Sequence, residues 1–166
     1  MKRPVWILLL LPMLACVVEQ PEKVVNKDLG YSVVFPGHPS SARHSEATPF
    51  GEIEWFNASY TSANRFDQTC SVEVGTLPDG KQGGSNQTEI LNTLKDWITW
   101  RYPGSILELY GKQGPGFEYT SSSSKENIIK GIIILRRGRL HHARGTTSDP
   151  NDPTFENFLS SFEVDP

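Results

Sequence analysis

Cysteine is scarce in this chain, and so are long apolar runs and any excess of one charge. The 166 residues include only two cysteines, Cys16 and Cys70, which is too few for a scaffold held together by several disulfides. The longest apolar run spans residues 5–11, whereas a helix that crosses a bilayer needs about 20 apolar residues. The 16 Lys and Arg residues nearly balance the 19 Asp and Glu residues. That balance argues against a nucleic-acid partner, because proteins that bind nucleic acid usually concentrate positive charge.

Sequence motifs of hydrolytic enzymes are also missing, since neither GxSxG nor HExxH occurs. What is present is ordinary for a soluble globular protein, with 37% hydrophobic and 21% charged residues. The length suits one domain with a sizeable core. We therefore expect a single non-enzymatic domain that needs no cofactor.

The first fifteen residues have the features of an export signal. Lys2 and Arg3 precede the apolar run at residues 5–11, and the small residue Ala15 ends the segment. A positively charged start, a short apolar stretch and a small residue at the end are typical of a secretory signal peptide. The run is too short for a spanning helix.

The sequence MLAC at residues 13–16 resembles the lipobox of bacterial lipoproteins, with Met13 where leucine is usual. The resemblance implies a diacylglycerol on the thiol of Cys16 and, after cleavage, a further acyl chain such as palmitate on its amine. Two or more chains anchor a protein stably, whereas one holds it only marginally. The alternative is an ordinary signal peptide cut near Ala15, with Cys16 as an incidental first residue.

These features divide the chain into three parts. We expect a lipoprotein signal peptide at residues 1–15, a lipidated cysteine and short tether at 16–27, and one α+β domain at 28–166. Val17 does not resemble the aspartate that retains lipoproteins in the inner membrane. We therefore expect a lipid-anchored envelope protein at the outer membrane, facing the periplasm. Its partners would be the membrane, through Cys16, and an envelope protein.

Strand signals dominate the first half of the domain. Residues 30–37, 52–62 and 69–77 carry β-branched and aromatic residues between turn residues, which predicts strands that could form an antiparallel meander. A helix should follow from Asn86, which forms a capping box with Glu89.

The second half of the domain predicts further strands and a closing helix. Residues 127–147 read as a hairpin with its turn near Arg137 and Gly138. Asp152 should cap the last helix, with Pro153 at its first position. Strands followed by separate helices predict an α+β domain: a curved antiparallel sheet of about six to eight strands with helices on its faces.

The opening LGYSVVFPGHP, the long middle helix, the basic hairpin and the closing FENFLSSFEV together resemble PsbP-like domains of exported bacterial proteins. The resemblance covers roughly residues 29–164. It implies a curved antiparallel sheet between helices, and a binding or accessory role. It implies no common catalytic residue and names no partner.

Four histidines are the main candidates for chemistry. Adjacent residues on a strand point to opposite faces, so His141 and His142 should not bind one metal ion together. A zinc site from His38, His44 and a late histidine would need converging ligands. Two alternatives to a binding role are a small periplasmic hydrolase using His38 or His142 and a small-ligand carrier with a pocket between sheet and helix.

A basic hairpin is the best candidate for a binding surface. Four arginines cluster in RRGRLHHAR, namely Arg136, Arg137, Arg139 and Arg144. They could meet anionic lipid headgroups or an acidic partner, or they could simply protect a strand edge from aggregation. Trp100 either lines a binding surface or packs at the rim of the core. Cys70, in a strand, should be a small buried side chain rather than a catalytic thiol.

Overall fold

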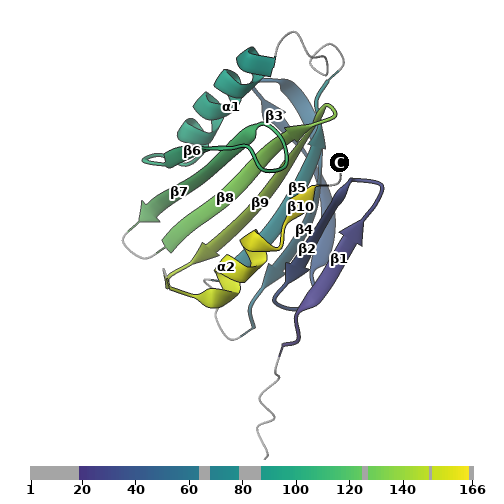
Figure 1. The fold of residues 1–166 in the computed structure, drawn as a ribbon, viewed down its shortest axis with the longest axis vertical. Coiled ribbons are helices and arrows are strands. Elements are labelled where there is room, and N and C mark those ends of the chain that lie inside the picture. Colours follow the sequence, from purple (N-terminus) through teal and green to yellow (C-terminus); the bar gives the residue numbers. More distant parts are fainter. Residues whose placement is uncertain (1–18, 64–67, 79–86, 125–126, 150, 165–166) are drawn as a thin grey trace, which may run out of the picture.

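The computed structural model describes residues 19–63, 68–78, 87–124, 127–149 and 151–164 (Figure 1). Signal peptide, Cys16 and the Asn86 cap lie outside these residues. The elements are β1 (Glu22–Asn26), β2 (Tyr31–Phe35), β3 (Ser40–Thr48), β4 (Gly51–Thr61), β5 (Thr69–Thr76), α1 (Gln87–Arg101), β6 (Ile106–Tyr110), β7 (Gly116–Ser124), β8 (Asn127–Arg136), β9 (Arg139–Thr147), α2 (Pro153–Ser160) and β10 (Glu163–Val164).

The strands form two antiparallel sheets. Seven strands make the main sheet in the order β3-β4-β5-β9-β8-β7-β6, and three make a smaller sheet in the order β1-β2-β10. The apolar side chains of α1 and α2 belong to two separate core clusters. The two helices therefore lie on opposite faces of the main sheet. This architecture confirms the predicted α+β class, with a main sheet inside the expected range of six to eight strands.

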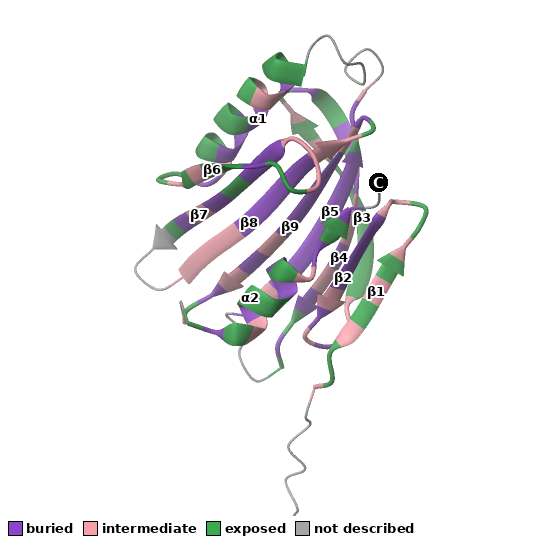
Figure 2. Ribbon diagram, in the orientation of Figure 1, coloured by how far each residue is buried: buried purple, intermediate pink, exposed green. Residues whose placement is uncertain are grey.

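The helix α1 covers one face of the main sheet with a helical stripe. Its buried residues are Ile90, Leu94, Trp97 and Ile98, and this spacing places them on one side of a helix. Trp97 stacks on Trp55 of β4 with the ring centroids 6.2 Å apart, and both rings are buried in the core. Figure 2 shows the buried side of α1 turned toward the sheet and its exposed side turned away.

The helix α2 covers the other face together with the small sheet. Asp152 caps it, as predicted, because its carboxylate accepts a hydrogen bond from the backbone N–H of Thr154 at 2.9 Å. Phe155 lies directly over Gly145 of β9, where an added Cβ would come within 2.0 Å of the ring. The missing side chain therefore lets the helix approach the sheet closely. Phe162 follows the end of α2 and is buried in the same core cluster as Phe155.

Two sequence expectations about the start of the domain are wrong. Glu22–Asn26 is not tether but strand β1, which pairs with β2 along its whole length. Tyr31–Phe35 does not join the meander of β3, β4 and β5 but lies in the small sheet between β1 and β10. Both strands bury apolar side chains against α2 and the main sheet, and this long-range packing is what places them there.

The hairpin turn between β8 and β9 lies where the sequence predicted it, at Arg137 and Gly138. Both residues have a positive φ, 49° and 72°. Two-residue turns of this kind match the twist of the strands that they join, and they favour glycine or asparagine at both positions. Gly138 fits that requirement at no steric cost, whereas Arg137 is in a conformation that is unfavourable for a residue with a Cβ.

Candidate functional site: a basic pocket beside the small sheet

Three of the four predicted arginines line one pocket. Arg136 and Arg139 flank the β8–β9 turn, and Arg137 lies in it. Arg144 does not belong to this group, which corrects the prediction. Its side chain lies on the α1 side of the sheet, where Nη1 donates a hydrogen bond to the hydroxyl of Tyr102 at 2.7 Å. The reason is strand alternation, because Arg139 and Arg144 are an odd number of residues apart and face opposite sides.

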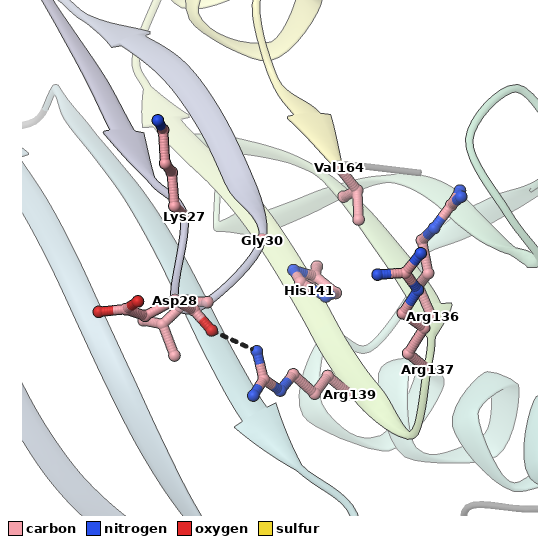
Figure 3. A pocket seen from close by; sticks show the side chains of 9 residues that line it. Lys27, Asp28, Gly30, Arg136, Arg137, Arg139, His141 and Val164 are labelled. Carbon is pink, nitrogen blue, oxygen red and sulfur yellow. Dashed lines mark hydrogen bonds between the residues drawn. The ribbon is translucent and has the colours of Figure 1, made fainter.

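The pocket has a volume of about 340 Å³ and lies between two turns that are distant in sequence. The β8–β9 hairpin supplies the arginines, and the β1–β2 turn supplies Lys27, Asp28, Leu29 and Gly30. Val164 of β10 completes the lining (Figure 3). The described lining therefore includes four cationic side chains and one carboxylate. In Figure 3 the carboxylate of Asp28 and the ammonium group of Lys27 both point away from the arginines.

Backbone carbonyls hold two of the arginines in place. Nη1 of Arg139 donates a hydrogen bond to the carbonyl oxygen of Asp28 at 2.6 Å, and Nη1 of Arg136 donates one to the carbonyl oxygen of Gln113. A guanidinium has five N–H donors, so each bond fixes the group while using one donor. The arginines are thereby oriented by neutral partners, and their charge is not cancelled by these bonds.

His141 lies at the floor of the pocket, as Figure 3 shows. Its side chain is almost fully buried, with 3% exposure, and Nδ1 has no hydrogen-bond partner among the described residues. Burial, with the nearby charges of Arg139 and Arg136, lowers its pKa to about 4. The imidazole is therefore neutral at pH 7, with a polar atom left unsatisfied beside a cluster of positive charge.

His142 lies on the opposite face, as the sequence predicted from strand alternation, and its ring lies beside a hydroxyl and a carboxylate. Nε2 lies 2.8 Å from the hydroxyl of Tyr119, and Nδ1 lies 3.3 Å from Oε2 of Glu73, outside hydrogen-bond geometry. Asn57 donates a hydrogen bond to the other carboxylate oxygen of Glu73 at 3.3 Å. Although desolvation opposes ionisation, contacts with His142 and Arg144 lower the pKa of Glu73 to about 2.

Glu73, His142 and Tyr119 are residue types that can form a proton relay in a hydrolase, but a substrate cannot reach them. All three side chains are buried, with His142 and Tyr119 each at 1% exposure. Burial raises the pKa of the Tyr119 hydroxyl strongly, so this group stays a protonated phenol and a weak nucleophile. The arrangement is suited to a buried polar network that positions α1 on the sheet.

The other histidine considered for hydrolysis lies on the surface. Nδ1 of His38 is 2.6 Å from a carboxylate oxygen of Glu22, and 87% of the His38 side chain is exposed. His44 is exposed on β3. Within the described residues, no three His, Cys, Asp or Glu side chains come close enough together to hold a metal ion. The geometry therefore gives no support to a zinc site built on His38, His44 and a late histidine.

Two further residues singled out in the sequence are placed clearly. Cys70 is fully buried in β5, as predicted, and burial raises the pKa of its thiol to about 12. Trp100 projects from α1 with 76% exposure, and Ile106 and Leu109 of the edge strand β6 are also exposed. Trp100 is thus a surface residue and not part of the core rim.

A second hollow, of about 260 Å³, lies between α2 and the sheet beside Tyr110 and Ile132.

Comparison with known proteins rests on structure. No family model matches this sequence, and no curated protein matches it. The solution structure of cyanobacterial PsbP (CyanoP) from Synechocystis sp. PCC 6803 superposes with a TM-score of 0.51. The match covers 90% of this chain and 95% of that one, at 15% sequence identity. The chain has the PsbP-type fold. Among the described residues, no helix has the length and apolar character to cross a membrane.

Sequence reasoning found the arginine side of the pocket and missed the rest. Lys27 was assigned to the tether, Gly30 to the first predicted strand, and Val164 to the closing segment. Their approach to the hairpin depends on β1 and β10 pairing with β2, which is a long-range event. A signal was present for His141, because strand alternation puts it on the same side as Arg139.

Proposed function

We propose that this chain is a lipid-anchored protein of the bacterial cell envelope with a non-catalytic binding or accessory role. The anchor would be the acylated Cys16, and the folded part would be held at the outer membrane, facing the periplasm. The lipobox-like MLAC sequence supports the anchor, and the PsbP-type fold is consistent with an accessory module.

The observation that carries the binding role is the contrast between the two faces of β9. On the α1 face, His142 is buried beneath the helix, with the Tyr119 hydroxyl 2.8 Å from Nε2 and a carboxylate oxygen of Glu73 3.3 Å from Nδ1. On the other face, an open basic pocket contains a histidine that no described protein group satisfies. A pocket whose arginines have further N–H donors, and whose described lining has no serine, threonine or cysteine, suits recognition rather than turnover.

Lipidation is tested by metabolic labelling with a palmitate analogue followed by membrane fractionation. The Cys16→Ser variant should lose both the label and membrane association, because the thiol is the predicted acylation site. Cys70→Ala is the matched control, since Cys70 is buried in β5 and should play no part in acylation. Unchanged labelling and sedimentation of Cys16→Ser would show that the chain is not anchored in this way.

A further inference from the structure

Two residues of the basic pocket, His141 and Arg137, are in locally unfavourable positions. Nδ1 of His141 is buried without a hydrogen-bond partner among the described residues, as is Nδ1 of His142 on the other face, and burial of an unpartnered polar atom is unfavourable. Arg137 occupies a turn position with φ of 49°, where glycine or asparagine would be preferred. Residues in unfavourable conformations or environments are concentrated at sites that serve function rather than folding.

The two arginines that flank the pocket have no carboxylate partner among the described residues, in contrast to those on the α1 face. Beneath α1, Arg101 pairs with Glu46, and Arg144 lies near Glu73, so cations and carboxylates match there. Around the pocket, Arg136 and Arg139 donate to backbone carbonyls, and the one carboxylate among the described lining residues, that of Asp28, points away. An anion in the pocket would give these two arginines a charged partner and Nδ1 of His141 an acceptor.

The geometry favours a phosphate group over a carboxylate. A phosphate monoester carries about −1.5 to −2 charges at pH 7 and three strong acceptor oxygens. Arg136 and Arg139 enter from strands β8 and β9, each fixed by one backbone carbonyl with further N–H donors remaining. A volume of about 340 Å³ lies near the lower end of the range for ligand pockets, so the ligand is small.

We propose that this pocket binds a phosphate group, with Arg136 and Arg139 on its flanks and Nδ1–H of His141 donating from the floor. This inference rests on the binding role proposed above but not on the lipid anchor. The phosphate could belong to a soluble small molecule or to a lipid headgroup. The pocket lies at the end of β1 away from the segment that leads to Cys16 (Figure 1), which places it about 16 Å along the strand from the tether.

The test is a calorimetric titration of the purified full chain in detergent with inorganic phosphate, at pH 7.5 and low salt. Saturable binding should appear, and Arg139→Gln, Arg136→Gln and His141→Phe should each raise the dissociation constant about tenfold, as for loss of one charge-assisted hydrogen bond. Arg43→Gln is the matched control: Arg43 is an exposed arginine on β3, and its loss should change the dissociation constant less than twofold.

Folding of each variant is checked by circular dichroism. Lys27→Gln, on an exposed turn, should fold normally and weaken phosphate binding about threefold. Acetate at the same concentrations should bind much more weakly than phosphate. Absence of saturable phosphate binding, equal binding of acetate, or pocket variants that bind like the wild type would each overturn the proposal.

The source of the phosphate is distinguished by placing the lipidated protein in vesicles. In phosphatidylcholine vesicles with added phosphatidic acid, whose headgroup is a phosphate monoester, loss of inorganic phosphate binding would assign the pocket to a headgroup of the same membrane. Unchanged binding, with displacement by glycerol 3-phosphate, would assign it to a soluble phosphate ester. Either result leaves the phosphate site in place, and a failure of Cys16 labelling would not alter the titration.

Discussion

The adjacent histidines of β9 allow one matched experiment, because substitution by phenylalanine should have opposite consequences at the two positions. In His142→Phe, the Tyr119 hydroxyl loses its partner at 2.8 Å, and Glu73 loses a neighbour at 3.3 Å while remaining buried. In His141→Phe, no hydrogen bond of Nδ1 to a described residue is lost, and the planar ring keeps most of its contacts.

The magnitude follows from these contacts. An unsatisfied buried hydroxyl costs about 1–3 kcal/mol, and removing one partner of a buried charged pair adds to that cost. Asn57 still donates to Glu73, so we expect His142→Phe to lower the free energy of unfolding by about 2–4 kcal/mol. For His141→Phe we expect a change within about 1 kcal/mol in either direction, because an unpaired polar group is replaced by an apolar one.

The assay is equilibrium unfolding in urea at pH 7, followed by tryptophan fluorescence. Trp55 and Trp97 are buried and stacked on each other under α1, so their emission reports on the core next to His142. The reasoning would be refuted if the two variants lost similar stability, or if His141→Phe were the more damaging.

Three other predictions concern stability. The lowered pKa of Glu73 contributes stability that is present above the unfolded pKa near 4.5 and is lost as the pH falls toward 2. The stability difference between wild type and Glu73→Gln should therefore shrink by about 3 kcal/mol over that range, and a constant difference in acid urea titrations would contradict it. Gly145→Ala should cost about 1–3 kcal/mol, because its Cβ would overlap the ring of Phe155; an unchanged melting temperature would argue against this close approach. Arg137→Asn should raise the free energy of unfolding by about 0.5–1 kcal/mol by relieving the positive φ, and a loss of stability would show that the arginine side chain supports the fold.

Local signals explain why some elements were predictable. The cap at Asp152, Pro153 after it and the aromatic spacing that follows are contained within a few residues, and α2 forms where they indicate. The β8–β9 hairpin was equally clear, because two apolar strands flank a turn with Gly138. The α+β class followed from the order of these elements.

Long-range pairing explains what the sequence did not reveal. Glu22–Asn26 has no strong strand pattern, and it becomes a strand only because β2 offers a partner. The pocket required that β1–β2 turn to reach the β8–β9 hairpin, more than a hundred residues later. The misplacement of Arg144 was avoidable, because the alternation that separated His141 from His142 also separates Arg139 from Arg144.

The most direct test of a binding role for the basic pocket is a nuclear magnetic resonance titration of the isotope-labelled full chain with inorganic phosphate. We expect shifts confined to the β1–β2 turn and the β8–β9 hairpin, and a new partner for Nδ1 of His141 visible in its imidazole nitrogen resonance. Shifts spread over other surfaces, or an unchanged His141 ring at saturating phosphate, would contradict the account.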